Sequence, residues 1–544
     1  MTIKDLNESY ILVQEDDYSV LKKLQKTLSP LVDGYQWNPK FRAGIWDGRI
    51  NFFTKLEQNL IQIPKGLKSA ILGFCKANQI EVEYEKDTYE NITEQEVNSF
   101  IESLKIPFEP YDYQKKAVLD SLNKGRLINE SATGSGKSLI IYILTRYFLA
   151  KNQSVFIIVP NIMLVNQIFE DFISYGYNKE EAEENVQRIG GEHKIKEITK
   201  PVCISTWQSQ YRSAQGYENI DCLIIDECQS VKGNESVLGT LIIPKCSNAK
   251  YRFGFTGTMP NSMVEKMSII SCLGRTNKVI NAQGLINAGL ATPVFIKTLY
   301  LNYPEDEREY IRKFKDYHKE EKFITEHQKR NSVVAKLLVK IAEKGNTLAL
   351  HSKIAHGDLL LENIVKLRSN EEVKIIKKIT STELETLDKN QKYYFKGKIT
   401  EKHKKIIEDN GFILDNFKSI ESLNVFCITG EVSGVEREYV RQILEEHNDA
   451  IILGSYQCMS TGINIKKLHN LVFCSSIKSS ITLLQSIGRV MRLHKSKNKV
   501  NMWDIVDNLE SKRGKENYFL KHFKERLGIY LDSGYPIEEK EINL

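Results

Sequence analysis

The most informative segment of this chain is Ser131-Ala-Thr-Gly-Ser-Gly-Lys-Ser138. It follows the run Leu127-Ile-Asn and precedes the run Leu139-Ile-Ile-Tyr-Ile-Leu, so the pattern predicts a strand, a glycine-rich turn and a helix. Consecutive backbone N–H groups and a helix N-terminus in this arrangement bind phosphate groups. The sequence therefore predicts a site for nucleotide phosphates, made by Thr133, Gly134, Ser135, Gly136, Lys137 and Ser138.

The residues of this turn have separate predicted roles. Gly134 and Gly136 allow the backbone to come close to the phosphates, and Lys137 would hold the β- and γ-phosphates. Ser138 would be a ligand of Mg²⁺, so ATP and Mg²⁺ are the expected cofactors. Ser131 stands where the general P-loop pattern has its first glycine, a departure from that pattern. The alternative is a glycine turn before an ordinary helix.

An acidic pair follows further along the chain, in Cys222-Leu-Ile-Ile-Asp226-Glu227-Cys-Gln229. An apolar strand that ends in two carboxylates suits a metal-holding Asp226 and a catalytic Glu227 that orients the attacking water. An Asp-Glu pair after a strand is common by itself, and the preceding P-loop gives it meaning. Phe255-Thr-Gly-Thr258 ends another strand; its hydroxyls would couple the phosphate site to the next domain, or simply cap a helix.

Short β-branched runs alternate with amphipathic helices over roughly 108–290 and again over 291–505, which predicts two α/β domains, each with an open parallel sheet. We expect an N-terminal accessory domain at 1–105, then domains at 106–290 and 291–507. A charged insertion near 362–420 is expected to be solvated, with nucleic-acid contact as the alternative, and residues 508–544 are expected to form a helical tail. The predicted strands are Arg126–Asn129, Val155–Val159, Val202–Ser205, Cys222–Ile225, Arg252–Phe255, Thr347–Leu350, Val425–Ile428, Ile451–Leu453, Leu471–Cys474 and Met502–Ile505.

The segment Gln485-Ser-Ile-Gly-Arg489-Val-Met-Arg492 completes the set of motifs. Two arginines three residues apart on one helix face can reach a γ-phosphate across a cleft as arginine fingers. A basic helix standing alone is more often a solvated face. We predict catalytic roles for Gln485, Arg489 and Arg492 because the other parts of an ATP site are present.

Composition sets the outer limits on function. The chain has 544 residues, 41% of them hydrophobic and 27% charged, which is typical of a globular protein. Its net charge of +6 permits nucleic-acid binding without demonstrating it. Nine scattered cysteines argue against a disulfide scaffold and against a zinc cluster. No apolar run approaches the ~20 residues that a membrane span needs, so we expect a cytoplasmic protein without a membrane partner.

These motifs, in this order, resemble superfamily 2 helicases over residues 108–505. The resemblance implies two RecA-like domains, with a small α+β domain in front, and an enzyme that hydrolyses ATP on nucleic acid. It implies that Gln114 reads adenine, and that Gly462 and Asn464 contribute to the ATP site. It further implies nucleic-acid contacts at Pro160, Asn161, Thr206, Gln208 and Thr461.

The segment Gly34-Tyr-Gln-Trp37-Asn-Pro-Lys-Phe41-Arg42-Ala-Gly-Ile-Trp46-Asp-Gly-Arg49 is similar to the small N-terminal domain of the phage UvsW recombination helicases. The resemblance of this chain to the RecG and XPB helicases is more distant. The UvsW resemblance implies 3′-to-5′ unwinding and branch migration of forks, D-loops or Holliday junctions in recombination, repair and replication. It also implies single-stranded and branched DNA as partners, single-strand-binding or recombination proteins as candidate partners, and the host-cell cytoplasm as the location of a phage-encoded protein.

Arg42 and Arg49 are interleaved with aromatic residues in this front domain, a combination that suits DNA. In the alternative interpretation the aromatic residues form the core of the small domain. Two other functions stay open at this point: a duplex-DNA translocase subunit that does not separate strands, and an RNA helicase.

Overall fold

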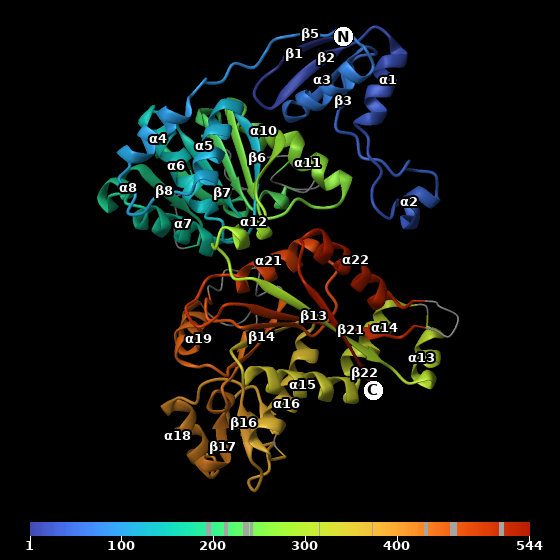
Figure 1. The fold of residues 1–544 in the computed structure, drawn as a ribbon, viewed down its shortest axis with the longest axis vertical. Coiled ribbons are helices and arrows are strands. Elements are labelled where there is room, and N and C mark those ends of the chain that lie inside the picture. The colour runs from blue at the N-terminus through green and yellow to red at the C-terminus, as the bar shows by residue number, and fades with distance from the viewer. Residues whose placement is uncertain are drawn as a thin grey trace. The chain divides into compact units, whose positions relative to one another are not determined.

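The computed structural model describes residues 1–191, 197–210, 216–231, 239, 243–314, 316–372, 374–428, 434–456, 465–510 and 516–544. The chain divides into two compact units, Met1–Asn281 and Ala282–Leu544 (Figure 1). This division falls slightly earlier than the boundary expected at residue 290.

The front of the first unit is a five-stranded sheet in the order β3-β4-β2-β1-β5. α1 packs on it because Leu21 and Leu24, three residues apart, point into one apolar core, and Asp17 caps its N-terminus. A short helix, α2 (Pro39–Arg42), contains Arg42, and Arg49 follows it outside the helix. The main elements are β1 (Thr2–Asp5), β2 (Tyr10–Gln14), α1 (Tyr18–Thr27), β3 (Thr54–Lys55), β4 (Leu60–Pro64), α3 (Lys68–Ala77) and β5 (Glu83–Tyr84).

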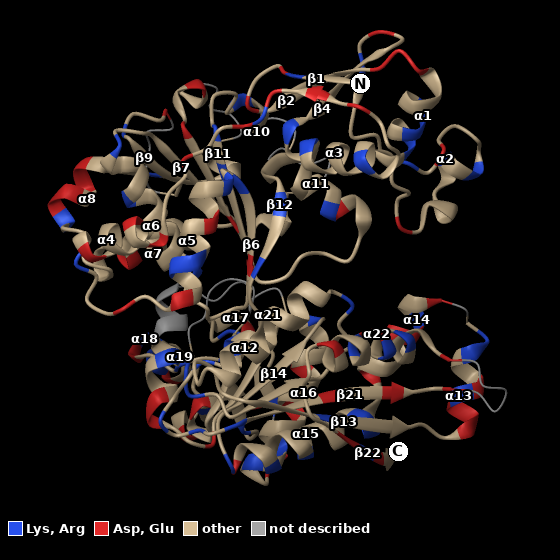
Figure 2. Ribbon diagram, turned by 45° about the horizontal axis from the view of Figure 1, so that its top comes forward, with Lys and Arg blue, Asp and Glu red and all other residues tan. Residues whose placement is uncertain are grey.

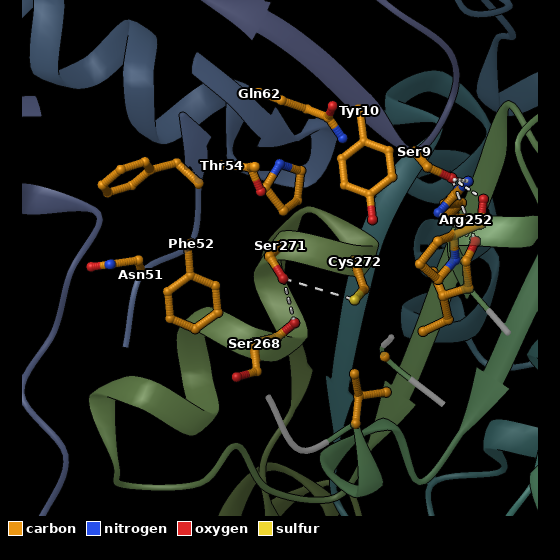
Figure 3. Close-up of a pocket in the computed structure, with 16 residues that line it drawn as sticks. Ser9, Tyr10, Asn51, Phe52, Thr54, Gln62, Arg252, Ser268, Ser271 and Cys272 are labelled. Atoms are coloured by element: carbon orange, nitrogen blue, oxygen red, sulfur yellow. Dashed lines mark hydrogen bonds between the residues drawn. The ribbon is translucent and has the colours of Figure 1, made fainter. Parts of the chain in front are cut away.

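This front domain is packed tightly on helix α11 (Met263–Leu273) of the same unit. A Cβ atom at Gly66 would lie 2.1 Å from the carbonyl oxygen of Ile270, so only glycine fits there. The fully buried Arg252 donates to the hydroxyl of Ser9 at 2.8 Å, beside a small cavity of about 210 Å³ (Figure 3). The front domain and the α/β domain behind it are therefore one packed unit.

The α/β domain of the first unit contains a seven-stranded, all-parallel sheet in the order β12-β6-β11-β10-β7-β9-β8. Successive residues of β7 belong alternately to two apolar clusters, so both faces of the sheet are covered. The strands are β6 (Arg126–Ser131), β7 (Val155–Val159), β8 (Val186–Ile189), β9 (Val202–Thr206), β10 (Cys222–Asp226), β11 (Tyr251–Thr256) and β12 (Arg275–Ile280). The helices are α4 (Glu94–Ser103), α5 (Asp112–Lys124), α6 (Lys137–Ala150), α7 (Ile162–Ser174), α8 (Lys179–Asn185), α9 (Trp207–Gln210), α10 (Ile243–Lys245) and α11.

The second unit has its own seven-stranded parallel sheet, in the order β18-β19-β14-β20-β21-β13-β22. The strands are β13 (Val294–Asn302), β14 (Thr347–His351), β18 (Val425–Ile428), β19 (Ile451–Ser455), β20 (Asn470–Phe473), β21 (Val500–Asn508) and β22 (Ile537–Asn543). The helices are α12 (Ala282–Asn287), α13 (Glu305–Arg312), α14 (Tyr317–Glu326), α15 (Gln328–Ala342), α16 (Ile354–Ser369), α19 (Gly434–Glu446), α21 (Ser480–Val490) and α22 (Tyr518–Asp532). Two parallel-sheet domains are thus confirmed, and every predicted strand is present within a few residues.

The insertion is more structured than the sequence suggested. Its strands β15 (Lys374–Ile376), β16 (Tyr393–Phe395) and β17 (Phe417–Ser419) form a separate parallel sheet. α17 (Ser381–Leu384) and α18 (Glu401–Asp409) accompany it, and Ile407, Phe412 and Phe417 lie in a core of its own. Because lysine and glutamate dominate this segment, its apolar pattern was not recognised in the sequence. The expectation of a merely solvated segment was therefore wrong.

The C-terminal tail is also built into the fold. α22 is helical as expected, but Ile537–Asn543 is a strand that pairs with β13 over its whole length and ends the second sheet. Its charged run Glu-Glu-Lys-Glu gave no sign of a strand in the sequence, although charged side chains are common in strands at a sheet edge.

None of the described helices is long and apolar enough to cross a membrane. The cysteines in the described part of the chain are all free, and no group of three or more possible metal-ligating side chains occurs there.

Candidate nucleotide and nucleic-acid site

The P-loop lies between β6, which ends at Ser131, and α6, which begins at Lys137. Gly134 and Gly136 have φ of +87° and +77°, a left-handed conformation that favours glycine. A Cβ atom at Gly136 would lie 2.4 Å from Nε2 of Gln114, whereas one at Gly134 would meet nothing within 4 Å. The crest of the loop therefore faces open space, as a phosphate-binding loop requires.

The loop is braced from inside the protein. The carbonyl oxygen of Ser135 accepts hydrogen bonds from Nε2 of Gln114 and from the hydroxyl of Tyr113, each at 2.8 Å. Oε1 of Gln114 accepts from the backbone N–H of Tyr111 at 2.9 Å. The hydroxyl of Ser131 donates to Ser135 Oγ at 2.6 Å. Ser131, which stands in place of the first glycine of the P-loop pattern, thus helps to stabilise the loop. Gln114 thus braces the loop, and its contact with adenine stays a prediction.

The acidic pair stands beside the loop at the carboxyl end of β10. Nζ of Lys137 lies 3.9 Å from Oε1 of Glu227 and 3.4 Å from the carbonyl oxygen of Ser131. Burial and the neighbouring Glu227 raise the pKa of Asp226, while Lys137 opposes that shift. A buried carboxyl whose ionised form is disfavoured is suited to a divalent cation, which would compensate its charge.

Ser138, the second predicted Mg²⁺ ligand, has neighbours that the sequence reading missed. Its hydroxyl lies 2.7 Å from the hydroxyl of Tyr175. Asp171 is close by, and burial raises its pKa to about 6 although the Ser138 hydroxyl partly counteracts the shift. Oxygen donors at Ser138 and Asp226 fit a Mg²⁺ ion together with nucleotide phosphates. No sequence signal distinguished Asp171 and Tyr175, because they lie on and just after an ordinary amphipathic helix.

A chain of hydrogen bonds joins the acidic pair to the end of β11. Nε2 of Gln229 donates to Oε2 of Glu227 at 2.7 Å, and the hydroxyl of Thr256 donates to Oε1 of Gln229 at 2.6 Å. The N–H of Thr258 donates to the same Thr256 hydroxyl at 3.2 Å. The N-cap of the following helix, α11, is Ser262. This geometry argues against a helix cap, and coupling to the next domain stays a prediction.

The residues that the resemblance assigns to nucleic acid in this unit lie side by side. β7 and β9 are neighbours and pair in register up to Val159 and Thr206, so Pro160 and Gln208 follow adjacent strand ends. Asn161 caps α7 by accepting from the N–H of Leu164 at 3.1 Å. Thr206 is buried and bonded to Ser209, whereas Gln208 is exposed. Asn161 and Thr206 therefore also have structural roles.

In the second unit Gln485 and Arg489 lie one helical turn apart on α21. Arg492 lies beyond the end of this helix, in the turn that follows, so the expectation of two arginines on one helix face was wrong. Burial lowers the pKa of Arg492. Thr461, Gly462 and Asn464 lie outside the described residues.

The loop that enters α21 is held by the C-terminal tail, a role that sequence reasoning missed. Arg526 of α22 is 3% exposed and binds Asp504 with two hydrogen bonds of 2.8 and 2.9 Å. The same guanidinium donates to Ser476 Oγ and to the carbonyl oxygen of Ile477 at 3.0 and 3.1 Å. Arg526 thus ties the tail helix to the segment that positions Arg489.

In the front domain the interleaved aromatic residues do not form the core, so the alternative interpretation is not supported. Trp37 is 70% exposed, and the guanidinium of Arg42 lies 5.3 Å from its ring. Arg49 is engaged by its own domain: it donates to the carbonyl oxygen of Ser29 at 2.5 Å, and Trp46 donates to the carbonyl oxygen of Arg49 at 2.8 Å.

An ATP-binding P-loop, an acidic pair and two RecA-like sheets define the chain as a nucleotide-driven motor of the helicase class. Three family models match it: "DNA helicase UvsW, N-terminal" over residues 1–85, "Type III restriction enzyme, res subunit" over 107–261, and "Helicase conserved C-terminal domain" over 384–494. The ATP-dependent DNA helicase uvsW of Enterobacteria phage T4 is 29% identical, covering 97% of this chain and 96% of the relative. These matches support a UvsW-like helicase of superfamily 2, and the chain is an ATP-dependent helicase.

Two solved structures are also similar. The crystal structure of T4 UvsW is 26% identical, with a TM-score of 0.46, covering all of this chain and 99% of the other. A fragment of an HsdR subunit of a type I restriction enzyme from Vibrio vulnificus is 14% identical, with a TM-score of 0.52, covering 94% of this chain and 84% of the other; it supports the fold alone.

Proposed function

We propose that this chain is a DNA helicase that unwinds and branch-migrates forked, D-loop or Holliday-junction DNA, moving 3′ to 5′, in recombination, repair and replication. The observation that carries the proposal is the gathering of Lys137, Ser138, Asp226 and Glu227 at one edge of the first sheet, in a chain similar to the phage T4 helicase over 97% of its length. DNA, single-stranded and branched, is the proposed partner, and ATP with Mg²⁺ the proposed cofactor.

The residues divide the work of hydrolysis. Bound ATP supplies the γ-phosphoryl group, and Mg²⁺ supplies charge for its transfer to water. Lys137 binds the phosphates, Ser138 and Asp226 hold the metal, and Glu227 orients the water and accepts its proton. Gln229 and Thr256 hold Glu227 by the hydrogen bonds described above, so a change at the phosphate site is transmitted to β11. Arg489 and Arg492 of the second unit supply positive charge to the transition state.

DNA contacts are proposed at Pro160, Asn161, Thr206, Gln208 and Thr461 as the motor track, and at Arg42 with the exposed Trp37 as a junction contact. Arg42 can bind a phosphate while the neighbouring indole stacks on an exposed base. Arg49 supports this segment, because its guanidinium is bonded to the backbone of Ser29. This refines the earlier expectation that both arginines bind DNA directly.

Substrate class is tested by measuring ATPase and strand separation on single-stranded, duplex, forked and four-way DNA, with matching RNA substrates. We expect fork and four-way DNA to be unwound, and DNA to stimulate hydrolysis more than RNA. An ATPase rate that increases with duplex length, without strand separation, would identify a translocase instead. Stronger stimulation of the ATPase by RNA than by DNA would identify an RNA helicase.

The junction contact is tested with Arg42→Ala, using Lys55→Ala on β3, another exposed cation of the front domain, as the matched control. Arg42→Ala should weaken fork binding several-fold and reduce the slope of log affinity against log salt by about 0.9, the value for one lost phosphate contact. Single-strand-stimulated ATPase should persist, because the motor residues are unchanged. Equal fork affinity of Arg42→Ala and Lys55→Ala would remove the junction contact from the proposal.

A further inference from the structure

The second unit contains a groove between α15 and the sheet strands β13, β21 and β22, with a volume of about 880 Å³. α15 lies along this side of the sheet in both views (Figures 1 and 2). Seven lysines line the groove, and no aspartate or glutamate occurs among the described residues that line it. The lysines are Lys297, Lys336, Lys340, Lys344, Lys497, Lys499 and Lys540.

Helical and strand periodicity bring these residues together from distant segments. Lys336 and Lys340 are one turn apart on α15, about 6 Å along its axis, and Lys344 lies in the turn just after the end of the helix. Val333, Leu337 and Ile341 form a parallel aliphatic row on the same helix face. From the sheet come pairs two residues apart, which point to one face: Lys297 with Leu299, Asn501 with Trp503, and Lys540 with Ile542. The groove has an apolar floor and a rim of ammonium groups.

The lysine charges are largely uncompensated. Glu538 lies beside the rim, 3.7 Å from Lys297 and 3.1 Å from Lys540. Lys497 donates to the carbonyl oxygens of Leu468 and Val490. Within the described part of the chain, the other four lysines (Lys336, Lys340, Lys344 and Lys499) form no ion pair. Such a concentration of like charge is unfavourable unless an anion is bound there.

The floor contains polar groups that also lack partners. Trp503 is 9% exposed, and its Nε1 has no hydrogen-bond partner in the described part of the chain. Nδ1 of His469 is likewise buried without a partner. Lys297 and Lys540 lie 5.2 and 5.7 Å from the Trp503 ring, so the indole holds two of the ammonium groups in place. Buried polar groups without partners are uncommon in folded proteins and suggest that a ligand or water completes them.

The groove is separate from the proposed motor track. Asn470 is the first residue of β20 and Asn501 the second of β21, so the groove lies toward the amino ends of these parallel strands. The segment 454–464, which the resemblance assigns to nucleic acid and ATP, begins instead at the carboxyl end of β19. None of the motor-track residues that the structure describes lines the groove.

We propose that this groove is a second binding site for single-stranded DNA, in which the lysines bind phosphates and the aliphatic floor receives sugars and base faces. A free phosphate or a mononucleotide would occupy only part of a seven-lysine rim. A duplex keeps its bases inside and cannot cover an apolar floor, whereas a single strand can. Lysine rather than arginine on the rim favours sequence-independent phosphate contact over the forked recognition of a carboxylate.

The proposed occupant is the strand displaced during unwinding, and this part rests on the proposed function. Strand separation yields two single strands, of which the motor track holds one. A site for the other strand on the same chain would hinder re-annealing behind the motor.

The test compares two triple variants of the full chain with equal loss of charge. Lys336→Gln/Lys340→Gln/Lys344→Gln removes three exposed rim lysines, and Lys313→Gln/Lys322→Gln/Lys329→Gln removes three exposed lysines of the same unit outside the groove. Glutamine and lysine have similar helix propensities, so both variants should fold. A short oligothymidylate is titrated to saturation, and oligothymidylate-stimulated ATPase is measured in parallel.

The wild type and the control variant should bind two oligonucleotides per chain. The groove variant should bind the second at least tenfold more weakly, with a salt slope smaller by about 2, since each lost single-strand phosphate contact contributes about 0.7. Its stimulated ATPase should be unchanged, because the motor track is intact. Loss of the second oligonucleotide would support the site even if the chain failed to unwind any substrate, so the two proposals can fail separately.

Three results would overturn the groove site: one oligonucleotide per wild-type chain, equal loss in both triple variants, or a groove variant that still binds two. Short duplex DNA and oligoglutamate serve as further probes. If either bound the groove in the wild type while oligothymidylate did not, the ligand would be a duplex or an acidic peptide, and the single-strand proposal would be wrong.

Discussion

The P-loop of the first unit and the lysine groove of the second both present positive charge to anions, but they are built in opposite ways. The P-loop is one continuous segment whose backbone is fixed by Gln114, Tyr113 and Ser131. The groove collects lysines from α15 and the turn after it, from β13 and β22, and from the segment before β21, and most of their ammonium groups have no fixed partner. Rigid, short-range support suits positioning of a reacting group, whereas mobile charge suits sequence-independent binding.

The largest expected effect separates the two regions completely. Lys137→Ala should reduce ATP hydrolysis by about 10³-fold or more, because the phosphates lose their only P-loop cation. DNA binding at the groove should be unaffected, since no groove residue belongs to the first unit. Steady-state ATPase and oligothymidylate titration on the same preparation measure both. Wild-type ATPase in this variant would remove the P-loop assignment.

Loss of the arginine fingers should have the next largest effect. Arg489→Ala and Arg492→Ala should each lower kcat by about 10³-fold with little change in ATP affinity, because fingers act on transition-state charge. Nucleotide binding is measured with a fluorescent ATP analogue, and hydrolysis by phosphate release. A large loss of nucleotide affinity with normal kcat would show that these residues bind the ground state instead.

A smaller effect is expected from the support behind the fingers. Ser476→Ala removes one acceptor of Arg526 without disturbing its ion pair with Asp504, and Arg526→Gln removes the whole connection. Arg526→Gln should lower kcat by about ten- to hundredfold, the effect of misplacing a catalytic group by an ångström, and Ser476→Ala should act in the same direction but less.

The control for this series is Lys524→Gln, an exposed position on the same helix that pairs with Glu516. Arg526→Gln also leaves Asp504 buried without its partner, so its melting temperature is measured beside kcat. If Ser476→Ala and Lys524→Gln were indistinguishable in kcat at equal stability, Arg526 would be a structural residue only.

The contrast between the two regions also explains what the sequence could predict. The P-loop, the acidic pair and the strands of both sheets were predictable, because each is a contiguous pattern with a fixed order of residue types. The groove was not, because Lys336, Lys497 and Lys540 are far apart in sequence and each resembles an ordinary surface lysine. Tyr175 and Arg526 were missed for the same reason: their partners are set by packing.

Charged composition misled the prediction at two further places. The insertion looked solvated because lysine and glutamate outnumber its core residues, yet Ile407 and Phe417 are buried. β22 looked like part of a helical tail, since glutamate and lysine favour helices, but pairing with β13 overrides that propensity. Both errors arose where tertiary contacts outweigh local preference.

The smallest expected effect concerns the titration of Lys497, one of the lysines that line the groove. Burial and the neighbouring Arg492 lower the pKa of Lys497 to about 8, below its value in an unfolded chain, although Glu445 opposes the shift. Between these two pKa values the unfolded state binds more protons, so the stability contributed by this group rises with pH. Relative to Lys497→Met, which cannot titrate, the wild type should gain about 2 °C in melting temperature between pH 7 and pH 9.5.

The comparison is made at fixed ionic strength by calorimetry, and saturating oligothymidylate should reduce the gain, because phosphates compensate the ammonium charge at low pH. If the melting temperatures of the two proteins changed equally with pH across this range, the charged form of Lys497 would not be destabilised in the folded protein. The contrast between the rigid P-loop and the positively charged groove would then depend on the exposed lysines alone.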